Sequence, residues 1–162
     1  MRTDERTGEV LDDLGGPDLV DPERVTAWCE YVARRVAPDE PPAPGLIKTP
    51  DSIIYDLEML GHLAAQNVRI VREADRTRRT AKRTLARARA LALREAKGRD
   101  VESRKAETEL ATLNATETVD NAEVAYQYAR DLAALVRDRT SAVQTQSKQV
   151  ELTYQLSGAA RA

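Results

Sequence analysis

Apolar residues recur at alternating steps of three and four along two long stretches of the chain, which is the spacing of coiled-coil helices. Polar residues interrupt the first ladder at Asn67 and Arg78, and the second at Thr140 and Ser147. The pattern predicts two long helices, over roughly 50–97 and 101–156. The apolar positions are Leu57, Leu60, Ala64, Val71, Ala74, Ala81, Leu85, Ala88 and Ala92, then Ala115, Val119, Ala122, Tyr126, Ala129, Ala133, Val136, Val143, Val150 and Tyr154.

Helix-breaking residues divide the chain at few places. Thr49-Pro50-Asp51-Ser52 has the residues of a helix start, and no proline follows Pro50. Gly98 lies between Lys97, which suits a helix C-terminus, and Asp100, which suits the next N-cap. We therefore expect the chain to turn near Gly98, in a left-handed cap, so that residues 50–158 form an antiparallel hairpin. A single helix running through Gly98 is the alternative.

The first third of the chain differs in composition. Residues 1–20 are acidic and contain paired glycines, which predicts a flexible arm. Asp21 and Pro22 predict the start of a short helix over 21–36, whose apolar face includes Trp28 and Cys29. We expect Trp28 to anchor this helix against the hairpin, and Cys29 to be a buried apolar residue. Residues 37–49 are rich in proline and predict a stiff linker.

The alanine-rich seams bury little area per residue, so at about 25 cal/mol per Å² they form a weak core. Four leucines flank the second seam and need cover of their own, which a second copy of the chain would supply. The predicted fold is all-α: a long, coiled-coil-like antiparallel hairpin with a short N-terminal helix, in a homo-oligomer. The leucines expected at the oligomer interface are Leu132, Leu135, Leu152 and Leu156.

Composition excludes several classes of protein. The 162 residues include 4% aromatic residues and no Phe, which argues against a large β-rich or α/β core. One Cys and one His, His62, leave no metal-ligand set or imidazole-based catalytic group, and no glycine-rich phosphate loop is present. We expect neither enzymatic activity nor a cofactor. The chain has no long apolar run and no signal-like N-terminus, so we expect a soluble cytoplasmic protein that does not enter a membrane.

Charge is distributed unevenly. Residues 1–71 carry 7 basic and 14 acidic side chains, whereas residues 72–105 carry 13 basic and 5 acidic ones. On the first long helix the basic residues fall within an arc of about 80° and extend over about 42 Å, opposite the apolar seam. No acidic residue falls within this arc between 69 and 97. The candidate nucleic-acid-binding residues, here called the basic stripe, are Arg69, Arg72, Arg76, Arg79, Arg83, Arg87, Arg94 and Lys97, followed by Arg104 and Lys105.

An arginine-rich stripe of this kind is suited to phosphate, because the planar guanidinium makes bidentate bonds to phosphate oxygens. Solvated coiled-coil faces normally mix Glu with Lys, and this face does not. A solvated face, an acidic protein partner and the acidic N-terminal region remain alternatives. Tyr126 and Tyr154 fall on the apolar ladder and are expected to pack, whereas Tyr128 lies off the ladder and is open to base stacking.

The hairpin resembles UvsY-type recombination mediators of tailed phages over residues 50–158. The resemblance lies in the basic segment Arg-Ala-Leu-Ala-Leu-Arg-Glu-Ala-Lys-Gly-Arg (89–99), in Arg-Lys-Ala-Glu (104–107) and in Ala-Tyr-Gln-Tyr-Ala-Arg-Asp-Leu (125–132). It implies a small, helical, ring-forming protein that binds single-stranded DNA and loads a RecA-like recombinase while displacing single-strand-binding protein. The resemblance assigns the family's DNA-binding role only to the basic residues of this chain from Arg69 to Arg104.

The expected function is therefore that of a non-enzymatic, single-stranded-DNA-binding recombination mediator or accessory protein, encoded by a tailed phage and active in the host cytoplasm. Its partners would be a recombinase, single-strand-binding protein or both. The main alternative is a phage virion structural or assembly protein, such as a connector, scaffold or tail-assembly component, whose basic stripe docks an acidic protein surface. A small terminase-like packaging subunit would prefer duplex DNA and would need a helix-turn-helix before residue 50.

Overall fold

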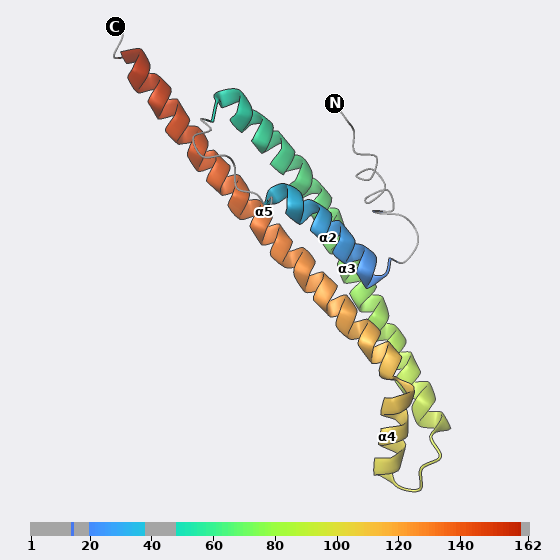
Figure 1. Cartoon of the computed structure of the whole chain (residues 1–162). Coiled ribbons are helices and arrows are strands. Elements are labelled where there is room, and N and C mark those ends of the chain that lie inside the picture. The colour runs from blue at the N-terminus through green and yellow to red at the C-terminus, as the bar shows by residue number, and fades with distance from the viewer. Residues whose placement is uncertain (1–13, 15–19, 38–47, 160–162) are drawn as a thin grey trace.

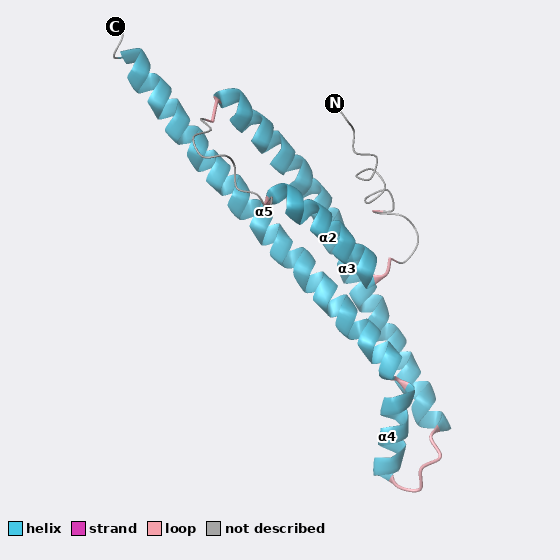
Figure 2. Ribbon diagram, in the orientation of Figure 1, coloured by secondary structure: helices cyan, strands magenta, loops and turns pink. Residues whose placement is uncertain are grey.

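The computed structural model describes Leu14 and residues 20–37 and 48–159. These residues form four helices and no strand: α2 (Pro22–Val36), α3 (Pro50–Glu95), α4 (Val101–Ala111) and α5 (Leu113–Ala159), as Figure 2 shows. The predicted all-α class is confirmed. The expected acidic arm lies outside the described residues except for Leu14 and Val20, and so does most of the expected linker.

The helix starts form as the sequence predicts. The Asp21 carboxylate accepts a hydrogen bond from the Arg24 N–H at 2.7 Å, with Pro22 in the first helical position. At the start of α3, Thr49 and Ser52 cap each other, with Oγ to N distances of 3.2 and 3.0 Å. Each cap satisfies N–H groups that have no partner within the helix, so the start is fixed locally.

The helices α3 and α5 run in opposite directions and pack along each other, with the end of α5 extending beyond the start of α3 (Figure 1). The contact is built largely from small side chains, as the apolar ladders indicate. Its buried residues include Leu60, Ala74, Ala81 and Leu85 on α3, and Ala122, Ala129, Val136 and Val143 on α5.

The short helix α2 packs against both long helices and supplies the bulk that the alanine seams lack. Trp28 is completely buried and forms one core cluster with Leu63, Ile70 and Leu132. Trp28 therefore anchors α2 as expected. The remaining buried apolar residues of α2 are Val25, Cys29, Val32 and Val36.

The turn between α3 and α4 differs from the expected left-handed cap. The helix α3 ends at Glu95, and its C-cap residue Ala96 has φ −59°. Gly98 has no positive φ; instead, a Cβ there would lie 2.7 Å from the Ser103 Cβ and 2.8 Å from the Arg104 nitrogen. The Glu107 carboxylate accepts hydrogen bonds from the Lys97 and Gly98 N–H groups at 2.9 and 3.3 Å. Close approach of the backbone is therefore what requires glycine.

The second predicted helix is interrupted at Thr112, which separates α4 from α5. The Thr112 N–H is shared between the carbonyls of Thr108 and Glu109 at 3.1 and 3.2 Å, and its hydroxyl also bonds to the Thr108 carbonyl at 2.9 Å. The backbone of Thr112 leaves the helical region, with φ −107° and ψ 9°, whereas Thr116 and Thr140 make the same hydroxyl-to-carbonyl bond without a break. The heptad pattern does not reveal this break, because a threonine is compatible with either arrangement.

Candidate nucleic-acid interface

All ten residues of the basic stripe are exposed. Seven lie on α3, on the edge turned away from α5, and Lys97 lies in the turn beyond the end of α3. Arg104 and Lys105 lie on α4. Every residue of the basic stripe is therefore exposed, along α3, in the turn beyond it and on α4; the turn and α4 together form one end of the molecule, here called the tip.

Three arginines at the proximal end of the stripe have partners. Arg69 donates to the Leu14 carbonyl, which ties the chain before α2 to α3. Arg76 lies 3.4 Å from the Glu73 carboxylate, and Arg79 lies 2.7 Å from the Asp75 carboxylate. Glu73 and Asp75 lie on α3 just outside the arc of the basic stripe, and their carboxylates contact arginines within it. This part of the stripe is partly neutralised within its own helix.

Four arginines of the stripe have no polar partner among the described residues: Arg72, Arg83, Arg87 and Arg94. Because a guanidinium is charged at every physiological pH, these side chains present positive charge that the described chain leaves unneutralised. Arg83, Arg87 and Arg94 lie toward the distal end of α3 and extend over about 17 Å at 1.5 Å per residue. This distal group is the strongest candidate for anion binding.

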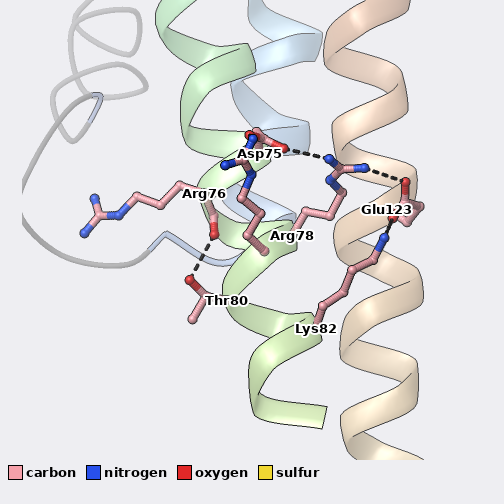
Figure 3. A network of polar contacts seen from close by, with 7 residues as sticks. Asp75, Arg76, Arg78, Thr80, Lys82 and Glu123 are labelled. Atoms are coloured by element: carbon pink, nitrogen blue, oxygen red, sulfur yellow. Dashed lines mark hydrogen bonds and ion pairs between the residues drawn. The ribbon is translucent and has the colours of Figure 1, made fainter. Parts of the chain in front are cut away.

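Arg78 joins the two long helices through a polar network (Figure 3). Its guanidinium donates to Asp75 at 2.8 Å and to Glu123 of α5 at 3.1 Å, and it stacks 4.1 Å from the centre of the Tyr126 ring. Lys82 lies 2.7 Å from the same Glu123 carboxylate. The sequence showed Arg78 only as an interruption of the apolar ladder.

The network stabilises the charged forms of its members. The hydrogen bond from Arg78, and then the bond and charge of Arg79, keep the pKa of Asp75 below its ordinary value. The pKa of Glu123 is lowered by its bonds to Lys82 and Arg78, while Asp75 raises the pKa of Arg78. Opposite charges and hydrogen bonds favour the charged form of each group. The network is therefore structural and fixes α3 against α5.

The four leucines expected at an oligomer interface have different environments. Leu132 is 2% exposed within the core of the single chain, so it has no surface for a neighbouring chain. Leu135 is 39% exposed, and Leu152 and Leu156 are 57% and 72% exposed. The predicted interface therefore reduces to the last three. The misplacement of Leu132 arises because its cover is α2, which the heptad pattern of the hairpin does not include.

The three tyrosines of α5 also differ in their environments. Tyr126 packs beneath Arg78, as a ladder position should. Tyr128 is half-buried against the core, and burial raises the pKa of its hydroxyl. Tyr154 is 59% exposed and, with Val150 and Ile53, lines a groove near the start of α3. Tyr154 is therefore more exposed than Tyr126, although both fall on the ladder.

The remaining candidate groups from the sequence are Cys29 and His62. Burial, and then the nearby Glu30 carboxylate, raise the pKa of the Cys29 thiol to about 12, which keeps it protonated and unreactive. The exposed His62 contacts Gln66 at 2.9 Å. Within the described part of the chain, no three metal-binding side chains gather at one place. None of the described helices combines the length and apolar character that crossing a membrane requires.

Comparison with known proteins adds no relative: no family model, no curated protein and no solved structure matches this chain. The fold and the candidate site together define an elongated all-helical protein with a basic edge. Its function has to be inferred from that edge and from the other surfaces of the chain.

Proposed function

We propose that the protein is a non-enzymatic, single-stranded-DNA-binding accessory protein that contacts the phosphate backbone through its basic stripe. The observation that carries this proposal is the group formed by Arg83, Arg87 and Arg94, which is exposed and has no partner among the described residues. Arginine forks bind phosphate bidentately, and each phosphate contact releases counterions. Affinity should therefore fall steeply with salt.

The narrower role is that of a recombination mediator of a tailed phage, which assists a RecA-like recombinase and contacts that recombinase or single-strand-binding protein. This step is supported by the resemblance of residues 50–158 to UvsY-type mediators. The helices α3 and α5 would form the repeating unit of a ring-shaped homo-oligomer. The exposed Leu135, Leu152 and Leu156 would contribute to contacts between subunits.

The test is fluorescence anisotropy with a labelled single-stranded oligonucleotide at two salt concentrations. The variant Arg83→Glu/Arg87→Glu/Arg94→Glu should bind at least about tenfold more weakly than the wild type, because it reverses three phosphate contacts. The matched control, Arg130→Glu/Arg137→Glu/Arg139→Glu, makes the same charge change at exposed positions of α5. Equal losses in both variants, or wild-type binding that is insensitive to salt, would contradict a specific phosphate site on the stripe.

A second candidate is a virion structural or assembly protein whose stripe docks an acidic protein surface. The ion pairs of Arg76 with Glu73 and of Arg79 with Asp75, both within α3, support it in that carboxylates are chemically suited to these arginines. It predicts a folded protein with no affinity for the oligonucleotide. A duplex of the same sequence, run beside the single strand, separates the mediator from a packaging subunit, which would prefer the duplex.

A further inference from the structure

The edge of the molecule opposite the basic stripe is acidic. Four exposed carboxylates on α5 fall within an arc of about 60°, and no basic residue enters that arc over the same stretch. They lie on the side of α5 turned away from buried Ala129 and Val136, and therefore away from α3. The residues of this acidic edge are Glu117, Asp120, Asp131 and Asp138.

The helix α2 packs on the side of the molecule between the two charged edges, and its first turn lines a pocket with Val124 at the border of the acidic edge. The α3 residues buried toward α2 include Ile70 and Thr77, and those of α5 include Ala125 and Leu132. At 100° per residue these positions lie on one side of the pair of long helices, about 90° or more from the centre of each charged edge. Among the described residues the two edges therefore carry opposite charge, and the Leu14 carbonyl accepts a hydrogen bond from Arg69 at one end of the basic edge.

The two edges also match in height along the molecule. Glu123 is bonded to both Arg78 and Lys82, which fixes the relative height of the antiparallel helices α3 and α5. Counting from that contact at 1.5 Å per residue, Asp120 stands within about one turn of the height of Arg83, and Asp131 near that of Arg72.

Arginines of the stripe with and without ion-pair partners differ in which α5 residue stands at their height. Arg72 and Arg83, which have no partner among the described residues, stand at the heights of acidic residues. Arg79, which is bonded to Asp75 of its own helix, stands at the height of Val124, an uncharged residue that is 70% exposed. The unneutralised charges of one edge therefore correspond to carboxylates on the other.

We propose that copies of this chain associate edge to edge, with α3 of one copy antiparallel to α5 of the next. In this arrangement Arg72 pairs with Asp131 of the neighbouring copy, and Arg83 pairs with its Asp120. The two surfaces differ, so the contact is heterologous and repeats from copy to copy into a closed ring or an open filament. Exposed ion pairs are individually weak, so the assembly is sensitive to salt.

The arrangement divides the basic stripe into two parts. By the same count Glu117 stands near the height of Arg87, so the part of the stripe from Arg72 to Arg87 faces the neighbouring copy, while Arg94 and the stripe residues beyond α3 remain free. Phosphate can reach these free residues in the assembly, whereas Arg83 and Arg87 contact either the neighbouring copy or phosphate. The assembly proposal does not rest on nucleic-acid binding, because it follows from the two edges alone.

The experiment uses two charge-reversed proteins. Asp120→Arg/Asp131→Arg places arginines opposite Arg83 and Arg72 of the neighbouring copy, and Arg72→Asp/Arg83→Asp places aspartates opposite its Asp131 and Asp120. Light scattering at low salt should give the wild type a mass that is a multiple of 18.0 kDa, and each variant alone a mass near 18.0 kDa. An equimolar mixture of the two variants should regain the higher mass, because each edge then meets an opposite one.

The control Glu102→Arg/Glu109→Arg makes the same charge change as the first variant on α4, away from both edges, and should keep the wild-type mass. Circular dichroism confirms that each variant is helical. A monomeric wild type, variants that keep the wild-type mass, or a mixture that stays monomeric would each overturn the proposal. Oligonucleotide binding by Asp120→Arg/Asp131→Arg reports separately on the proposed function, since every residue of the basic stripe is intact in that variant.

Discussion

At the scale of single residues, Leu132 and Leu152 have the same side chain on the same helix and opposite surroundings. Leu132 is 2% exposed and belongs to the core that contains Trp28, whereas Leu152 is 57% exposed. At 100° per residue the two lie about 160° apart around α5, Leu132 beside the alanine ladder and Leu152 on the far side. Leu132 is buried because α2 covers it, and heptad spacing within the hairpin carries no information about α2.

Replacing each of these leucines by alanine should affect the free energy of unfolding very differently. Leu132→Ala should lower the free energy of unfolding by about 2–5 kcal/mol, the usual loss for a buried leucine. Leu152→Ala should change it by less than about 0.5 kcal/mol within a single chain. Urea denaturation followed by circular dichroism measures both. If Leu132 instead formed a subunit contact, its effect would grow with protein concentration, which repeating the titration at two concentrations would reveal.

At the scale of helices, local signals predicted the starts well and the interruptions poorly. The caps at Asp21, Thr49 and Asp100 all form, because each depends only on residues within one turn. The close approach at Gly98 depends on how α4 folds back toward the end of α3. Such contacts between segments leave no periodic signal. The same holds for Arg78, whose partners lie on two helices.

The network around Arg78 should make the packing of α3 on α5 sensitive to acid. The pKa values of Asp75 and Glu123 are lowered in the folded chain. Their contribution to stability is therefore present above the ordinary carboxyl pKa of about 4, and it is lost as the pH falls through the lowered values. Asp75→Asn/Glu123→Gln should be less stable than the wild type at pH 7, and the difference should shrink toward pH 2.

Urea midpoints measured between pH 7 and pH 2 test this. The control Glu102→Gln/Glu109→Gln removes two exposed carboxylates from α4 and should follow the wild-type profile. A constant difference between the network variant and the wild type across the whole range would mean that the lowered pKa values do not contribute to folding stability.

At the scale of the whole molecule, the sequence predicted the helical class and the exposure of the basic stripe, since both follow from periodicity and charge along one helix. The acidic edge of α5 was present in the sequence as well, at positions 117, 120, 131 and 138, but its meaning depends on height relative to α3. That height is set by contacts between the helices, such as those of Glu123 with Arg78 and Lys82. The correspondence between charged surfaces on two different helices therefore could not be predicted from the sequence alone.

Stability should also vary along the length of the molecule. Large buried side chains are concentrated where α2 packs, around Leu63, Ile70 and Leu132, whereas α4 has no buried residue and residues 151–156 are all exposed. Local opening costs least where few apolar contacts are broken. In native-state hydrogen exchange, amides of α4 and of residues 151–156 should exchange at least about a hundredfold faster than those of residues 63–77 and 125–136.

Assembly through the charged edges would change this profile in a specific way. Contacts from Arg72 to Asp131 and from Arg83 to Asp120 lie at the middle of the molecule, so raising the salt concentration should reduce protection there and leave α4 unchanged. The exchange experiment at two salt concentrations therefore tests the distribution of stability and locates the contact between copies. Uniform protection along the chain would contradict a core centred on α2, and salt-dependent protection at the tip would place the contact elsewhere.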